Sequence, residues 1–381
     1  MEDHILTDNF YHTVDLFIQL LGEDAVNKSD CFFRISRAAI GSYVDYSEIQ
    51  RILARIKSFD NWYDAWEVSA DRFARIAGEA ETTGHLVTAG KNYLRAGLLY
   101  HFAQLFTRPE DPARSEGQEK RVAYYRKACP YLFPKVEPIE IPFGKLGLPG
   151  YLRLPVGVQL PPVIVMIPGA NSVKEELHHW GEKFTELGIA TLAFDGPGQG
   201  ERSLRNKGVP LRLETFHHAV TAVINYLETR REVDAKRLVC WGQSTGGHLA
   251  MRAAANDTRI HAAVSLGGGY DFRMDIESTT PADIWEEDRD LYGLSSFAES
   301  ESYIREFGSM QGIIEKVSCP LLVVHGARDN CVAMEEIERL KQEATGPVTL
   351  MVYEDGNHSV CNYNLEMSEA VADWVADQLS R

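Results

Sequence analysis

The chain has 381 residues, 44% hydrophobic and 25% charged, which is enough for one large folded domain and a smaller second one. Its formal net charge of -16 disfavours binding to phosphate backbones or anionic membrane surfaces, and no local run of Lys and Arg offers an exception. The composition therefore predicts a globular protein that binds neither nucleic acid nor membranes.

The N-terminus carries Glu2, Asp3 and Asp8 where a signal peptide would carry basic residues, and no apolar run approaches the roughly 18 residues of a membrane span. We therefore expect a cytoplasmic protein. The six cysteines are scattered, without the dense spacing of a disulfide framework or a CxxC pair for zinc or redox chemistry. Reduced thiols are expected, and no metal or cofactor is implied.

The first third of the chain shows apolar residues at helical spacing, for example at Ile49, Ile52 and Leu53. Residues 93–106 are apolar on more than one face, which predicts a helix packed between others, with its aromatic side chains in the core rather than in a substrate wall. The polar stretch 108–117 contains two prolines and predicts a loop within this helical part.

Four prolines between Cys129 and Pro142 end the helical pattern, and we place a boundary near Pro134. Residues 1–134 are then a helical domain and residues 135–381 a catalytic domain. In the second part, β-branched runs alternate with amphipathic segments, which is typical of a mostly parallel sheet with helices on both faces. The predicted strands span residues 151–154, 163–167, 190–194, 238–241, 262–266, 321–325 and 350–353.

The connection between the fifth and sixth of these strands is unusually long. It spans residues 270–317 and is rich in charged and aromatic residues, which is too much chain for a plain loop. We expect a partly helical insertion that acts as a lid.

A G-x-S-x-G sequence surrounds Ser244, between a predicted strand and a predicted helix. This context is that of a nucleophile elbow, in which a strained turn lifts the serine hydroxyl above the sheet. Glycines are needed there because the turn leaves no room for neighbouring Cβ atoms. Ser244 is therefore the predicted nucleophile.

A nucleophilic serine needs a base and an acid that orients the base, and in such proteins the chain order is Ser, acid, His. Asp329 follows the predicted strand 321–325, and His358 follows the predicted strand 350–353. They are the predicted acid and base. Asp355 is the rival acid, but it lies only three residues before His358 on the same loop, which is poor geometry for reaching the ring.

The negative oxygen that forms on attack needs backbone N–H groups aimed at it. The predicted donors are Thr245, which follows the nucleophile, and Ala170, in the loop after the strand 163–167. The run FDGPGQGE at residues 194–201 lacks the spacing of a phosphate-binding loop and predicts a tight turn.

Several stretches together resemble one family: LPGYLRLP at 148–155, SVKEE at 172–176, FDGPGQGE and GQSTGG. The sequence is similar to the α/β-hydrolases related to 2,6-dihydroxypseudooxynicotine hydrolase and to fungal polyketide-shortening hydrolases. The resemblance implies a helical N-terminal domain that covers the active site and helps to form a homodimer. It also implies hydrolysis of a carbon-carbon bond next to a ketone, with Ser244, Asp329 and His358 as the triad and Glu277 as an acidic substrate-binding residue.

The leading interpretation is thus a serine hydrolase that acts on a small β-diketone or acyl-hydroxyaromatic substrate through an acyl-enzyme. A carboxylesterase with the same triad is the main alternative. An interaction protein that has lost catalysis is disfavoured by the intact triad. A prolyl-oligopeptidase-like enzyme is disfavoured because helices occupy the first third, where such an enzyme carries a propeller of repeated strands.

Overall fold

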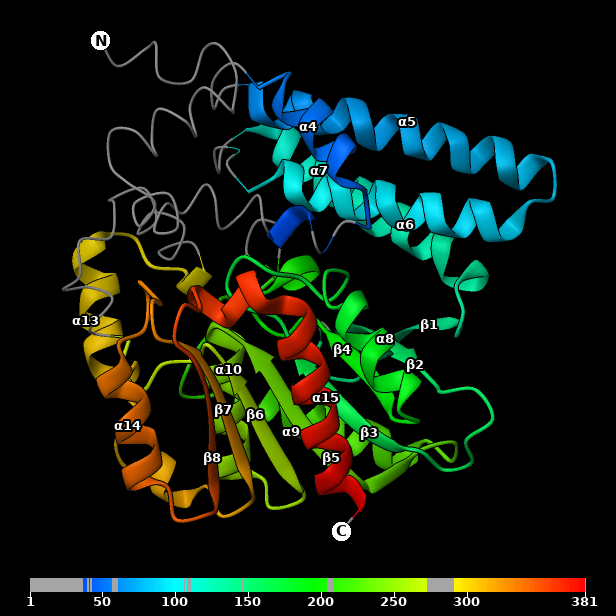
Figure 1. Cartoon of the computed structure of the whole chain (residues 1–381). Helices are drawn as coiled ribbons and strands as arrows, with labels where there is room; N and C mark the ends of the chain where they lie inside the picture. Colours follow the sequence, from blue (N-terminus) through cyan, green and yellow to red (C-terminus); the bar gives the residue numbers. More distant parts are fainter. Residues whose placement is uncertain are drawn as a thin grey trace. The chain divides into compact units, whose positions relative to one another are not determined.

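The computed structural model describes residues 37–39, 41, 43–56, 61–105, 107, 111–145, 147–203, 208–272 and 291–380 (Figure 1). The chain divides into two compact units, residues 1–136 and 137–381, each with its own hydrophobic core. Among the helices in these ranges, none has both the length and the apolar character that crossing a bilayer requires.

The first unit is helical in its described part. It contains α4 (Tyr46–Leu53), α5 (Trp62–Thr82), α6 (Leu86–Ala103), α7 (Pro112–Ala128) and the 3-10 turn η2 (Cys129–Tyr131). Helix α6 packs against both α5 and α7. Tyr93, Leu99 and Phe102 are all buried, so α6 is the helix between others that the apolar pattern predicts.

The prediction of a loop over residues 108–117 is wrong for most of its length, because α7 already begins at Pro112. Asp111 caps the helix, since its side chain accepts a hydrogen bond from the Ala113 N–H at 2.9 Å. Proline at the first helical position costs nothing, because that N–H has no partner inside the helix. The polar, proline-containing stretch therefore marks a helix start, and residues 108–110 lie outside the described ranges.

The second unit is built on an eight-stranded sheet with the order β1-β2-β4-β3-β5-β6-β7-β8. Strand β2 runs antiparallel to β4, and the pairs from β4 through β3 and β5 to β8 are parallel. The strands are β1 (Val136–Ile141), β2 (Leu148–Arg153), β3 (Pro162–Ile167), β4 (Ala190–Phe194), β5 (Asp234–Gln243), β6 (Ala262–Leu266), β7 (Leu321–Gly326) and β8 (Val348–Tyr353). The loops at the carboxyl ends of parallel strands meet at one edge of such a sheet.

Helices cover both faces of this sheet (Figure 1). Apolar residues of α8 and α15 pack on one face around Trp241, and those of α9, α10, α13 and α14 join the larger core on the other. The helices are α8 (His178–Glu186), α9 (His217–Thr229), α10 (Thr245–Asn256), α13 (Phe297–Phe307), α14 (Met334–Glu343) and α15 (Asn364–Ser380). The predicted fold class, a mostly parallel sheet between helices with a helical N-terminal region, is confirmed.

Two predicted strands, 190–194 and 262–266, match the observed β4 and β6 at both ends. Strand β5 is longer than predicted, because its exposed start near Lys236 and Arg237 carries no apolar signal. In the long connection 270–317, α13 supplies the helix that was expected, while residues 273–290 lie outside the described ranges.

Candidate active site

Strand β5 leads directly into α10, and Ser244 stands at the turn between them. Its backbone has φ 55° and ψ -126°, a conformation that is costly for a residue with a Cβ atom. A side chain on Gly242 would collide with the carbonyl of Gly246, and one on Gly246 would collide with the carbonyl of Ile167. The glycines are therefore a steric requirement of the turn that places the serine hydroxyl at the start of α10.

Three side chains from three loops form one hydrogen-bonded chain. Nε2 of His358 lies 2.9 Å from Oγ of Ser244. Nδ1 of His358 faces the two carboxylate oxygens of Asp329 at 3.0 and 2.9 Å. A carboxylate only accepts hydrogen bonds, so Nδ1 carries the proton and Nε2 can accept one from the serine hydroxyl. The structure thus brings together the three residues that the sequence singles out.

The charges around the hydrogen bonds of Ser244, His358 and Asp329 favour an ion pair between Asp329 and His358. Burial alone would raise the pKa of Asp329, but the facing His358 and a backbone N–H of Cys331 at 2.8 Å hold that pKa below its usual value. Burial alone would lower the pKa of His358, but the charge of Asp329 outweighs it and keeps this pKa well above its ordinary value. Asp329 is therefore ionised and holds the imidazole in place.

Two further groups, the rival acid Asp355 and the nearby His325, lie outside these hydrogen bonds. Asp355 is exposed and pairs with Arg328 at 2.7 Å, on the surface rather than at the ring of His358. His325 is buried at the end of β7, with its Nδ1 3.9 Å from Asp329, which is too far for a hydrogen bond. Neither replaces Asp329 or His358 in the hydrogen-bonded chain.

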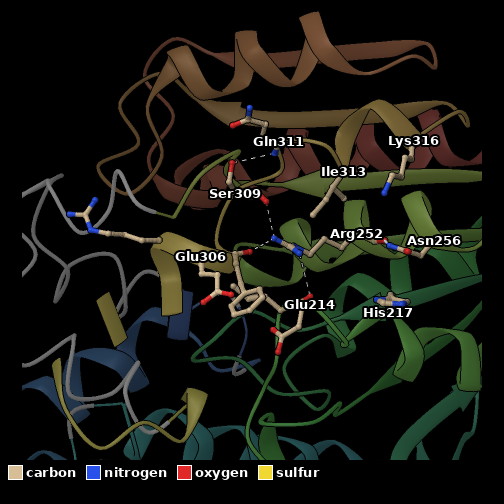
Figure 2. A pocket seen from close by; sticks show the side chains of 12 residues that line it. Glu214, His217, Arg252, Asn256, Glu306, Ser309, Gln311, Ile313 and Lys316 are labelled. Carbon is tan, nitrogen blue, oxygen red and sulfur yellow. Dashed lines mark hydrogen bonds between the residues drawn. The ribbon is translucent and has the colours of Figure 1, made fainter. Parts of the chain in front are cut away.

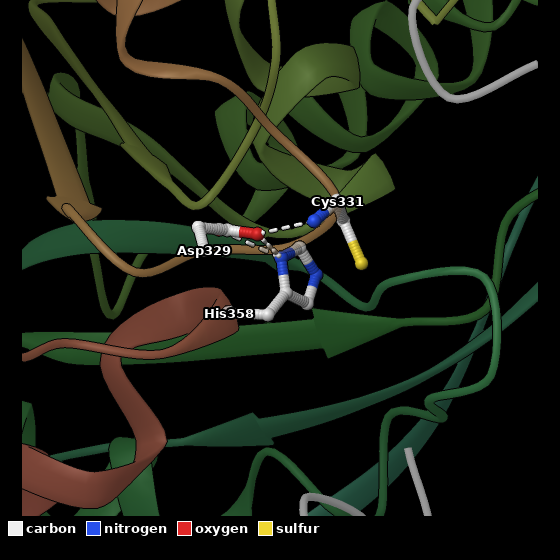
Figure 3. Close-up of side chains that lie close together, drawn as sticks. All are labelled: Asp329, Cys331 and His358. Carbon is white, nitrogen blue, oxygen red and sulfur yellow. Dashed lines mark hydrogen bonds and ion pairs between the residues drawn. The ribbon is translucent and has the colours of Figure 1, made fainter. Parts of the chain in front are cut away.

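Cys331 is a neighbour of this chain that the sequence reasoning missed (Figure 3). One donor atom from each of Asp329, Cys331 and His358 lies within 4.8 Å of the others, and carboxylate, thiolate and imidazole are ligands that zinc accepts. However, Nδ1 of His358 and both oxygens of Asp329 are engaged with each other, and Nε2 faces Ser244. We therefore assign the cluster to the hydrogen-bonded chain and not to a metal. The only feature of the sequence that could have indicated this contact is the position of Cys331, two residues after the predicted acid Asp329.

The two predicted oxyanion donors lie on segments next to the serine. Thr245 is the first residue of α10, where the backbone N–H has no partner within the helix. The loop after β3 passes close to Ser244, because a Cβ atom on Gly169 would lie 3.2 Å from the serine Cβ. Ala170 is the next residue of that loop. Glu277, the expected acidic pocket residue, lies outside the described residues.

A hollow of about 410 Å³ lies where the ends of α9, α10 and α13 meet, and neither Ser244 nor His358 lines it (Figure 2). Its wall includes the buried Arg252, which donates from Nε to Nε2 of His248 at 2.7 Å and from Nη2 to the carbonyl of Ser309 at 2.9 Å. The first bond lies within α10, and the second ties α10 to the segment after α13. We therefore assign Arg252 a role in holding the fold and give the hollow no ligand.

Two families of hydrolases match the chain, each over more than half of its length. The prolyl oligopeptidase family matches residues 179–381, and the family described as FrsA-like esterases matches residues 22–274. Both matches include Ser244. They agree with a hydrolase built on this sheet.

Individual proteins match over most of the chain. The 2,6-dihydropseudooxynicotine hydrolase of Paenarthrobacter nicotinovorans is 29% identical over 337 residues, which are 88% of this chain and 89% of that protein. Hydrolase LUC6 of a Fusarium species is 30% identical over 78% of this chain and 81% of its own. The crystal structure of 2,6-dihydroxy-pseudo-oxynicotine hydrolase superposes with a TM-score of 0.82 and 26% identity, covering 90% of this chain and 95% of that one. The chain therefore belongs to the α/β-hydrolase family that contains 2,6-dihydropseudooxynicotine hydrolase and related fungal hydrolases.

Proposed function

We propose that the protein is a serine hydrolase that cleaves a carbon-carbon bond next to a ketone, with Ser244, His358 and Asp329 as its catalytic triad. The hydrogen-bonded chain from Ser244 to Asp329 is the observation that carries the chemistry. The similarity to 2,6-dihydropseudooxynicotine hydrolase over 88% of the chain supports the choice of bond. The substrate is a small β-diketone or an acyl group on a hydroxylated aromatic ring.

In the first step, Oγ of Ser244 attacks the ketone carbon while Nε2 of His358 takes the hydroxyl proton. The carbonyl oxygen becomes negatively charged, and the backbone N–H groups of Thr245 and Ala170 stabilise it. Asp329 stabilises the imidazolium that forms. The product of this step is a tetrahedral adduct bonded to Ser244.

When the adduct collapses, the carbon-carbon bond breaks and its electron pair goes to the leaving carbon. A second carbonyl or a hydroxylated ring must stabilise that pair, which is why the substrate class is restricted. Protonated His358 gives its proton to the leaving carbon, directly or with help from an acidic substrate-binding residue, the role that the resemblance gives to Glu277. Water, activated by the now neutral His358, then hydrolyses the acyl-enzyme to a carboxylic acid and regenerates Ser244.

A substrate panel in labelled water tests this proposal. The panel holds 1,3-diketones, acylphloroglucinol-like ketones and nitrophenyl esters, with acid release followed by mass spectrometry. Cleavage in 18O-water must place one 18O in the released acid, because water hydrolyses the acyl-enzyme. Efficient ester turnover without cleavage of any ketone would overturn the carbon-carbon proposal and leave the triad standing.

A carboxylesterase is the second candidate, because the match to the FrsA-like esterase family spans residues 22–274 and includes the serine. An ester needs no proton on carbon, since an alkoxide leaves readily. The same panel therefore separates the two candidates. Peptide substrates belong in it too, because residues 179–381 match the prolyl oligopeptidase family.

We also propose that the helical unit helps to close the substrate site and to form a homodimer in the cytoplasm. The proposal rests on the resemblance to 2,6-dihydropseudooxynicotine hydrolase over 88% of the chain, because α5 and α7 already bury most of the apolar surface of α6. Analytical ultracentrifugation of the whole chain measures its mass in solution. A chain that starts at Lys135 and remains monomeric and fully active would contradict this role.

A further inference from the structure

The turn that follows β4 contains a buried amide that reaches the loop after β3. The side chain of Gln199 is only 1% exposed. Its Nε2 donates a hydrogen bond to the carbonyl of Pro168 at 2.6 Å, and its Oε1 accepts one from the N–H of Gly196 at 3.1 Å. Both ends of the amide are therefore used, and one of them holds the first residue of the neighbouring loop.

The hydrogen bond from Gln199 to the Pro168 carbonyl fixes the peptide plane between Pro168 and Gly169, which is the first of two successive planes in this loop. The carbonyl of Gly169 in the next plane accepts a hydrogen bond from the N–H of Ser172 at 3.2 Å. In a planar trans peptide, the C=O and the N–H of the following residue point in opposite directions. A hydrogen bond that fixes the carbonyl therefore also fixes the direction of that N–H. Gly169 lies between the two planes and would otherwise let them rotate with little steric resistance. The direction of the Ala170 N–H thus depends on both anchors.

The far end of the same loop is held by Asp195, which is fully buried. Its carboxylate accepts hydrogen bonds from the backbone N–H of Lys174 at 3.0 Å and from the Lys174 ammonium at 2.7 Å. It also accepts the backbone N–H of Glu201 at 3.0 Å. The loop from Pro168 to Lys174 is therefore clamped at both ends by the turn after β4.

We propose that Gln199 is a positioning residue that aims the Ala170 N–H at the developing negative oxygen. The inference rests on the proposed function, because it assumes that Ser244 attacks a carbonyl group. It gives the FDGPGQGE run a role in the reaction. A residue of this kind acts on the transition state more than on the bound substrate, so its loss lowers kcat and leaves KM nearly unchanged.

The test compares Gln199→Met, which loses both hydrogen bonds, with Gln199→Glu, which keeps the acceptor for Gly196 and loses the donor to Pro168 when its buried carboxyl is ionised. The matched control is Gln378→Met, which changes a different buried glutamine, on α15. Active sites are counted by complete labelling with a fluorophosphonate, and kcat is expressed per labelled site. The assay can use any substrate, ketone or ester, whose turnover disappears in Ser244→Ala. The test of Gln199 therefore remains valid if the carbon-carbon proposal fails.

Both Gln199 variants should lose about tenfold or more in kcat per labelled site, with KM within about twofold, since deleting a whole oxyanion donor costs roughly 100- to 1000-fold. Their rate of labelling should fall in parallel. Their Tm should fall below that of Gln378→Met, because Pro168 and Gly196 lose buried hydrogen bonds, and expressing kcat per labelled site removes this effect. An unchanged kcat per labelled site in Gln199→Met, or in Gln199→Glu at a pH where its carboxyl is ionised, would overturn the proposal. A loss of activity explained wholly by fewer labelled sites would also overturn it.

Discussion

Oγ of Ser244 lies 2.9 Å from Nε2 of His358, although 114 positions separate the two residues in the chain. The loop that carries His358 turns sharply, because Ser359 and Val360 both have positive φ. A Cβ atom on Gly267, at the end of β6, would approach the Cα atom of Ser359 to 3.0 Å. The imidazole of His358 is thus held in place by a neighbouring loop and not only by its partner Asp329.

Ser244→Ala should abolish turnover and leave the fold intact, because the change removes the nucleophile and little packing. We expect a loss of about a thousandfold or more in kcat, measured beside Tm. Ser318→Ala, at an exposed serine of the same unit, is the control and should keep full activity. More than about one hundredth of the wild-type rate in the first variant would contradict the assignment of the nucleophile.

The two candidate acids can be separated by equivalent substitutions. Asp329→Asn should cost about 10,000-fold in kcat, because an amide at this position favours the wrong tautomer of His358. Asp355→Asn removes only a surface ion pair with Arg328, so kcat should stay within about twofold. Steady-state kinetics give kcat for both variants. A larger loss of kcat in Asp355→Asn than in Asp329→Asn would make Asp355 the acid.

The pH dependence should report the raised pKa of His358. Protonated His358 cannot take the proton of Ser244, so kcat/KM should fall as the pH drops through a pKa above the ordinary 6.5. The charged and titratable neighbours are Asp329, which dominates, together with Cys331 and His325. The rate of fluorophosphonate labelling should follow the same curve. An acidic limb centred below 6.5 would show that Asp329 does not control this imidazole.

Cys331 should be dispensable for catalysis and yet make the enzyme sensitive to bulky thiol reagents. Asp329 accepts its hydrogen bond from the backbone N–H of Cys331, and a serine hydroxyl can replace the hydrogen bond of the thiol to His358, so Cys331→Ser should keep most of the activity. The thiol is on an exposed residue beside His358, where an N-ethylmaleimide adduct would block substrate. Wild type should lose activity with this reagent while Cys331→Ser resists it. Equal inactivation of both would place the sensitive group elsewhere.

The sequence was sufficient where local pattern decides structure. Strand β4 is a short apolar run with sharp limits, and chain order placed Ser244, Asp329 and His358 on loops that the fold brings together. The prediction of a loop failed at Pro112, because proline is common both in loops and at the first position of a helix. The sequence reasoning also missed Gln199, because its role comes from a contact with Pro168, 31 positions away, that leaves no local trace.

The unusual backbone of Ser244 makes the turn between β5 and α10 a source of instability for the folded chain. A residue with a Cβ atom held at φ 55° and ψ -126° costs roughly 1–3 kcal/mol, which glycine would largely avoid. Ser244→Gly should therefore be inactive and yet unfold at a higher temperature than Ser244→Ala. The serine side chain is thus retained at this turn at a cost in stability that a glycine would not carry.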